Sequence, residues 1–325
     1  MRIAVTGATG HIGINLVKAL VSQNYKVKVL VHNNTSDLSN YDVDIIVGDL
    51  LNPKSLIQLC KDVDIVIHLA AVISIGLSSS NDVYNINVQG TKNIVDVAIG
   101  QGVKKLIHFS SIHAIVQEPL NKTLDEKGAI AFDSKIPYEV TKATAEQWVL
   151  NQQSNTFDVV VLSPTSVIGP EDPGPSLMGE FMCGAFNRTI PGVVPGGYDW
   201  VDVRDIVDAT ITAISKGKGG NKYILSGAWL SIKEFADLWM NTCGSNRRLP
   251  VIPLWLAKFG VPFLYVFAKL TRTKPVYTNE SLSILQSGNR QISSLKAQTE
   301  LGFHSRALEE TFIDSHKWYK ENKYI

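Results

Sequence analysis

The chain has 325 residues, of which 45% are hydrophobic and 19% are charged, as in a soluble globular protein. Its 31 Lys and Arg residues nearly balance its 30 Asp and Glu residues, and the formal net charge is +1. This balance argues against a nucleic-acid partner and gives no reason to expect binding to an anionic membrane surface, while the apolar content excludes a disordered chain.

Strands and helices alternate through the first half of the chain. Short apolar or alternating segments predict strands, and apolar residues at helical spacing predict the helices between them. This alternation predicts an α/β fold with a doubly wound parallel sheet. The predicted strands cover residues 2–6, 26–31, 44–47, 64–69, 105–110 and 158–163, and the predicted helices cover residues 12–22, 53–61, 81–100 and 137–153.

The character of the sequence changes after Pro164. Glycine and proline concentrate in residues 169–179 and 191–197, which we predict to be loops around a helix that carries Phe181 and Phe186. The remaining predicted elements are a helix at 203–216, a strand at 222–225, a helix after the capping box of Ser231 and Glu234, and an amphipathic helix at 308–320.

The cysteines and the apolar runs indicate in which cellular compartment the protein is expected. Cys60, Cys183 and Cys243 lie far apart, so we expect neither a metal site nor a disulfide framework, and a reducing, cytoplasmic compartment is favoured. No signal peptide is visible. The apolar run 249–270 is interrupted by prolines and lysines, and we therefore predict a lid or core segment and no membrane span.

A glycine-rich turn joins the first predicted strand to the first predicted helix. Gly7 permits a tight turn, Gly10 lets the backbone approach a pyrophosphate at the helix N-terminus, and Gly13 lets the helix pack closely. Because the turn follows a first strand and opens a helix, it predicts nucleotide binding rather than an ordinary turn. The turn reads Gly7-Ala8-Thr9-Gly10-His11-Ile12-Gly13.

This G-x-x-G-x-x-G spacing resembles that of the extended short-chain dehydrogenase/reductase family, also called the NAD-dependent epimerase/dehydratase superfamily. The resemblance implies a Rossmann domain that binds a nicotinamide dinucleotide. On the residues alone, Asp49 could cap a helix and Asn87 could serve helix packing. Three further motifs match the family in order and spacing, namely Gly48-Asp49-Leu50, His68-Leu69-Ala70-Ala71 and Asn87-Val88-Gln89-Gly90-Thr91.

The resemblance also implies where the cofactor and the substrate lie. The Rossmann domain would comprise residues 1–165 and 201–226, and a smaller C-terminal substrate-binding lobe would comprise residues 166–200 and 227–325. Besides the turn, the implied cofactor-binding residues are Asp49 and Leu50 near the adenine, Leu69, Ala70 and Ala71 after the fourth strand, and Asn87, Tyr138, Lys142 and Pro164.

The end of the second predicted strand bears on the choice between NADP and NAD. The segment 31–34 contains no carboxylate, so nothing in it would repel the 2′-phosphate of NADP. His32 follows this strand and is partly charged at neutral pH. We therefore expect NADP, with NAD possible; alternatively, His32 is only a solvated strand-end residue.

Tyr138 and Lys142 are candidates for proton chemistry. Four residues apart on a helix, they share one face, and a nearby ammonium lowers the pKa of a phenol. The segment 103–111 resembles that of dihydroflavonol reductases, which places the family's catalytic serine on Ser111. The resemblance implies that Ser111, Tyr138 and Lys142 are catalytic and that Lys142 holds the nicotinamide ribose. We expect His113 to line the pocket wall.

The sixth strand and its continuation indicate the branch of the family. Residues 162–170 resemble the dihydroflavonol reductase and hydroxysteroid dehydrogenase branches. We expect an NADP-dependent carbonyl reductase, dihydroflavonol 4-reductase-like, that acts on a small or hydrophobic aldehyde or ketone. A homodimer is compatible with the resemblance. The alternatives are a nucleotide-sugar epimerase or dehydratase and a non-catalytic NADP-binding regulator. The expected apolar lid residues are Ile73, Ile75, Met178, Phe181, Phe186, Tyr198 and Trp200.

Overall fold

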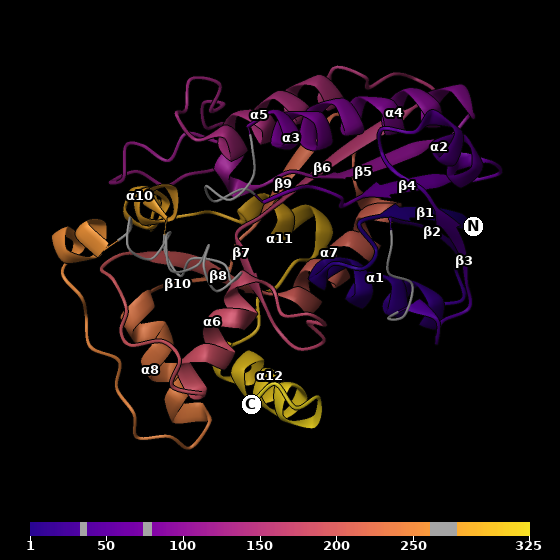
Figure 1. Cartoon of the computed structure of the whole chain (residues 1–325). Helices are drawn as coiled ribbons and strands as arrows, with labels where there is room; N and C mark the ends of the chain where they lie inside the picture. Colours follow the sequence, from indigo (N-terminus) through magenta and orange to yellow (C-terminus); the bar gives the residue numbers. More distant parts are fainter. Residues whose placement is uncertain (33–37, 74–79, 261–277) are drawn as a thin grey trace.

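The structure, a computed structural model, describes residues 1–32, 38–73, 80–260 and 278–325. A seven-stranded parallel sheet with the order β3-β2-β1-β4-β5-β6-β9 forms its centre (Figure 1). The α/β fold predicted from the sequence is confirmed. The strands are β1 (Arg2–Thr6), β2 (Lys26–Val31), β3 (Val43–Val47), β4 (Ile65–His68), β5 (Lys105–Phe109), β6 (Asp158–Pro164) and β9 (Asn221–Leu225).

Helices cover both faces of this sheet, as Figure 1 shows. The strand order reverses between β1 and β4, and ligands of such sheets bind at the carboxyl ends of the strands near that point. One face carries α2 (Pro53–Cys60), α3 (Ser80–Tyr84), a π-helical segment (Asn85–Gly90), α4 (Thr91–Gly100) and α5 (Pro137–Leu150), and the other carries α1 (His11–Ser22), α7 (Val203–Lys216) and α11 (Leu295–Leu301).

The helix predicted at 81–100 is not one regular α-helix. A π-helical segment separates α3 from α4 and contains Asn87, which is 2% exposed. A π-segment places one extra residue in a turn, which a 3.6-residue periodicity does not reveal, and such segments are frequent at functional sites. Here it turns Asn87 toward the end of β4, where its side chain bonds Val72.

A second sheet, with the order β10-β8-β7, lies beyond β6 in the chain. The sequence analysis did not predict its strands, because β7 has three residues and β8 begins at the glycine that ends a predicted loop. The predicted capping box of Ser231 and Glu234 is confirmed. The elements here are β7 (Ser166–Ile168), α6 (Leu177–Phe186), β8 (Gly197–Asp202), β10 (Ala228–Ser231), α8 (Ile232–Thr242), α10 (Asn279–Ser287) and α12 (Leu308–Glu321).

Aromatic side chains form a separate core between β8, α8 and α12. The ring of Phe235 lies 4.2 Å from Trp200 and 4.9 Å from Phe312, centroid to centroid, and all three residues are fully buried. The expectation that Trp200 lines a lid is therefore wrong. Met178, Phe181 and Tyr198, which were also expected in the lid, pack against this same core, and Ile75 lies outside the described residues.

The apolar run 249–270 is described only as far as residue 260. Residues 254–260 are helical, and Trp255 and Phe259 are 71% and 67% exposed. The rest of the predicted lid or core segment lies outside the described residues. Among the helices of the described ranges, none has the length and apolar character needed to cross a membrane.

We predict that Phe312→Ala lowers the free energy of unfolding by about 3–5 kcal/mol, because it leaves a cavity among fully buried rings. Urea denaturation measures the change. The control is Ile313→Ala at the next position, which is 58% exposed and should change stability by less than about 0.5 kcal/mol. Equal effects of the two substitutions would contradict the proposed core.

Candidate active site

The glycine-rich turn lies at the carboxyl end of β1, against the segment that follows β4. Gly7 has a φ of +73°, and a Cβ atom there would lie 2.7 Å from the backbone nitrogen of Ala70. A Cβ on Gly13 would lie 2.1 Å from the carbonyl oxygen of Gly7, so α1 packs directly on the turn. Gly10 caps α1 without a side-chain hydrogen bond. Backbone N–H groups at such a helix start suit a pyrophosphate, and the turn therefore fits a dinucleotide.

The remaining predicted residues of the turn differ in exposure. Ala8 is fully buried, whereas Thr9 and Ile12 are partly exposed. The ring of His11 points toward the loop after β7, where its Nε2 lies 3.1 Å from the Pro170 oxygen. Because the ring is engaged with Pro170, the group of His11 that would face a cofactor is its backbone N–H, at the first position of α1.

Asp49 lies at the end of β3, beside the end of β2. Its Oδ1 accepts a hydrogen bond from the Leu51 nitrogen at 2.6 Å, and its Oδ2 lies 3.3 Å from Nε2 of His32. A carboxylate is thus present beside the exposed His32, although segment 31–34 contains none. Leu50 is 6% exposed and packs in the core on the α4 side of the sheet.

Asn87 holds the segment after β4 in place. Its Oδ1 accepts from the Val72 nitrogen at 2.7 Å, and its Nδ2 donates to the Val72 oxygen at 3.0 Å and to Thr141 of α5 at 3.2 Å. These bonds occupy the amide, so its side chain positions the loop. The loop residues Leu69, Ala70 and Ala71 are half-buried, and Pro164 is buried at the end of β6.

The three predicted catalytic residues meet where β5 ends beneath the start of α5. Ser111 caps a short 3₁₀ turn by accepting from the His113 nitrogen at 3.2 Å, and its side chain also acts on the Tyr138 hydroxyl, whose pKa it lowers. The Nζ of Lys142 donates to the Phe109 oxygen at 2.8 Å. All three side chains are at least nine-tenths buried.

The electrostatics of Tyr138 differ from the expectation. Burial raises the pKa of Tyr138, the hydrogen bond from Ser111 lowers it, and the charge of Glu139 raises it further, with a net increase. The net direction is therefore opposite to the expected lowering, because burial outweighs the effects that favour the phenolate; the ammonium group of Lys142 donates to a backbone oxygen. Lys142 itself is fully buried; burial lowers its pKa to about 8, and the charge of Glu146 opposes this shift.

Two buried histidines flank Lys142, and the sequence analysis assigned neither a role. The Nδ1 of His68 lies 2.6 Å from the Thr6 hydroxyl and its Nε2 lies 2.9 Å from the Thr91 hydroxyl. His108 stacks on His68 at 5.5 Å, and its ring nitrogens have no partner among the described residues. Burial lowers the pKa of His68 to about 3 and that of His108 well below its usual value. Both rings are therefore neutral at physiological pH.

His113 and Glu139 form a second polar pair beside Tyr138. The Nδ1 of His113 lies 3.5 Å from the Glu139 carboxylate, and the two rings of His113 and Tyr138 meet edge to face at 6.4 Å. Burial raises the pKa of Glu139, but the contact with His113 and the hydrogen bond from Ser134 outweigh it and lower the pKa overall. Glu139 lies between Tyr138 and Lys142 on α5, and its contact with His113 could not be predicted from the spacing of those residues.

Comparisons with known proteins show what the chain is similar to. A model of the NAD dependent epimerase/dehydratase family matches residues 3–226. The chain is 30% identical to Sterol demethylase protein B of Methylococcus capsulatus, over all of both chains, and 28% identical to a provisionally named dihydroflavonol 4-reductase of Synechocystis, over 99% of this chain and 95% of the relative. The crystal structure of gox2253 superposes with a TM-score of 0.84, at 26% identity over 99% of each chain.

Asn87→Ala tests how the loop after β4 is positioned. We expect it to lower the free energy of unfolding by about 1–3 kcal/mol, because the buried backbone groups of Val72 lose their partner, and to weaken dinucleotide binding. Thermal unfolding and cofactor fluorescence measure the two effects. Gln89→Ala, at an exposed position of the same segment, is the matched control and should change neither. Unchanged cofactor affinity in Asn87→Ala would remove its positioning role.

Proposed function

Because the chain belongs to the NAD dependent epimerase/dehydratase family, and is thus an NAD(P)-dependent enzyme with a Rossmann fold, we propose that it is an NADP-dependent carbonyl reductase. The observation that carries this proposal is the burial of Ser111, Tyr138 and the Lys142 ammonium group together where β5 ends, with the Ser111 side chain acting on the Tyr138 hydroxyl. Together they offer a proton donor, a second hydroxyl to hold a substrate oxygen, and a fixed positive charge.

Each of the three residues has a distinct role in the proposed reduction. A bound nicotinamide supplies the hydride that reaches the carbonyl carbon. Tyr138 donates its hydroxyl proton to the carbonyl oxygen, and Ser111 donates a hydrogen bond that orients that oxygen. The Lys142 charge stabilises the phenolate left on Tyr138 until a solvent proton replaces the one transferred. The raised pKa of Tyr138 keeps its proton in place before the reaction.

The residues of the turn and of the loop after β4 are proposed to hold the cofactor. The N-terminus of α1, from Gly10, would bind the pyrophosphate. Asp49 would lie near the adenine, with Oδ2 facing His32. Leu69, Ala70 and Ala71 would line the cofactor, with Pro164 at the end of β6.

We propose a hydrophobic aldehyde or ketone as the substrate, bound against the lobe formed by residues 166–200 and 227–325. The segments 73–80 and 167–182 contain no Lys or Arg, so they suit an uncharged molecule better than an anion. The names of two relatives, a sterol demethylase protein and a dihydroflavonol 4-reductase, are compatible with a hydrophobic substrate. Asp172 in this region is 2% exposed and bonded to Ser176 and Tyr319, so it is turned away from such a pocket.

Two further expectations stay proposals. A homodimer would pair the helices that contain Asn87 and Tyr138, as in many relatives that the sequence resembles. The three free cysteines are compatible with a reducing, cytoplasmic location.

Arg204, which could otherwise be considered for anion binding, is bonded to Asp202 and Asp314 at the start of α7.

Tyr138→Phe tests the catalytic assignment. We expect it to bind NADPH as the wild type does and to lose about 10²- to 10⁴-fold in kcat, because the proton donor is gone and the ring is kept. NADPH oxidation over a panel of aldehydes and ketones measures the rate. Activity within a few-fold of wild type would exclude Tyr138 as the proton donor. A wild type inactive on the whole panel would favour the alternative of a non-catalytic regulator.

Nucleotide sugars are predicted not to bind. A diphosphate needs several charge-assisted hydrogen bonds of about 1.5–3 kcal/mol each, and segments 73–80 and 167–182 offer no cation for them. Calorimetric titration with UDP and UDP-glucose in the presence of NADP measures binding. Micromolar affinity, or an epimerised sugar, would instead support the epimerase alternative.

The cofactor preference is predicted to be NADPH over NADH. His32 is exposed at the end of β2, where its ring lies 3.3 Å from Asp49 and would also be within reach of a 2′-phosphate. His32→Asp should reverse the preference, because it adds a second carboxylate beside Asp49. Titrations of both cofactors check this, with His32→Asn as the neutral control. Tighter binding of NADH by the wild type would overturn the assignment.

A further inference from the structure

A buried ion pair lies next to the proposed catalytic residues but outside them. Glu146 follows Lys142 by one turn of α5 and is fully buried. Its Oε1 lies 3.0 Å from Nζ of Lys222 on β9, and its Oε2 has no partner among the described residues. Burying a carboxylate costs folding free energy unless an opposite charge or hydrogen bonds compensate for its lost hydration.

The register of the sheet brings Lys222 beneath α5. Paired positions run across neighbouring parallel strands from His68 on β4 to His108 on β5, Val161 on β6 and Lys222 on β9. Register partners in a parallel sheet point to the same face, which here is the face covered by α4 and α5. Lys222 therefore extends from the edge strand to Glu146 within the same layer as Lys142.

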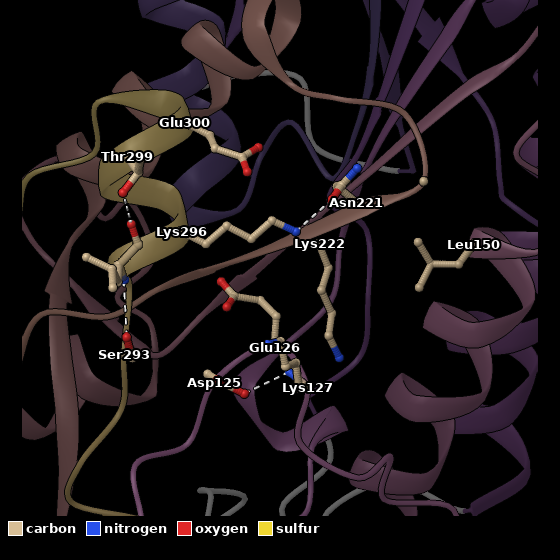
Figure 2. A pocket seen from close by; sticks show the side chains of 12 residues that line it. Asp125, Glu126, Lys127, Leu150, Asn221, Lys222, Ser293, Lys296, Thr299 and Glu300 are labelled. Carbon is tan, nitrogen blue, oxygen red and sulfur yellow. Dashed lines mark hydrogen bonds between the residues drawn. The ribbon is translucent and has the colours of Figure 1, made fainter.

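Lys222 also reaches the surface, at a pocket of about 640 Å³ beside β9 and α11. Figure 2 shows it there with Glu126, Lys127 and Lys296. Its side chain is 10% exposed, whereas that of Glu146 is fully buried. The ion pair thus has one member that water can reach and one that it cannot.

The groups that face Lys142 come from several elements. On α5 these are Tyr138 and Glu146, and on β4 and β5 they are His68 and His108, both of which interact with the charge of Lys142. The two imidazoles are neutral. Among the described residues, Glu146 supplies the negative charge that acts on Lys142, and Lys222 anchors it from β9.

We propose that Glu146, anchored by Lys222, is a positioning residue whose charge keeps the buried Lys142 ammonium protonated during the carbonyl reduction. The catalytic consequence of this inference rests on the proposed function. The electrostatic effect is independent of that function, because a buried ammonium loses its proton more easily and a nearby carboxylate opposes that loss. Lys222 makes the burial of Glu146 tolerable by pairing with it.

Glu146→Gln provides the direct test, because it removes the charge and keeps the shape. The proton loss of Lys142 is followed by ¹⁵N NMR of its Nζ, with the signal assigned by its absence in Lys142→Met. We expect the titration midpoint to fall by about one pH unit in Glu146→Gln. From a wild-type value of about 8, this gives about fivefold lower kcat at pH 8 and nearly unchanged kcat at pH 6. An unchanged midpoint would overturn the proposal.

Two further variants test whether the change in the Lys142 midpoint has a purely structural cause. Glu146→Gln combined with Lys222→Met removes both members of the ion pair, so Lys222 is not left without its partner, and the protein should fold. Because the Lys222 charge is lost as well, we expect a Lys142 midpoint between those of Glu146→Gln and the wild type. The matched control Glu300→Gln removes a carboxylate from the same pocket, where it pairs with Lys218, and should leave the midpoint unchanged. A double variant with the wild-type midpoint would contradict the proposed role of the charge.

The NMR titration also separates this inference from the proposed function, since it needs no substrate. A lowered midpoint in a protein that reduces no carbonyl compound would support the role of Glu146 and reject the reductase. Carbonyl reduction by the wild type together with an unchanged Lys142 midpoint in Glu146→Gln would support the reductase and reject the role of Glu146.

Discussion

The Lys142 ammonium group is buried between α5 and the sheet, and a charge in that position constrains the elements around it. The Phe109 oxygen at the end of β5 accepts its hydrogen bond, and Glu146 lies one turn further along α5. The neighbouring imidazoles of His68 and His108 stay neutral, because burial and the Lys142 charge both disfavour a second cation there. The face of the sheet beneath α5 is consequently polar at its centre, although the rest of that face is apolar.

Close backbone packing joins this charged centre to the turn that fits a dinucleotide. Gly7 lies against Ala70 with no room for a Cβ atom, and Asn87 bonds both the segment after β4 and Thr141 of α5. Direct contacts thus hold the turn, the loop and α5 in place relative to one another. On the other side of the turn, the ring of His11 bonds the oxygen of Pro170, so the first turn of α1 also contacts the loop that leads into the lobe.

Much of this arrangement could be predicted from the sequence. Alternating strands and helices, the spacing of the glycines, and the four-residue separation of Tyr138 and Lys142 are local patterns, and the fold follows from them. The Glu146–Lys222 pair could not be predicted, because its members are 76 residues apart and meet only through the register of four strands. The pKa of Tyr138 was misjudged for a related reason: spacing places Lys142 on the same helix face but does not reveal that burial of Tyr138 outweighs the effects that favour its phenolate.

The fate of the hydride tests the reductase assignment most directly. NADPH carrying deuterium at the transferred position of C4 would be incubated with the protein and the best ketone of a substrate panel, and the products analysed by mass spectrometry. We expect one deuterium on the carbinol carbon of the alcohol and one NADP formed per alcohol. A product that carries deuterium without net oxidation of the cofactor, or an isomerised substrate with none, would contradict a carbonyl reductase and indicate the redox-neutral chemistry of an epimerase.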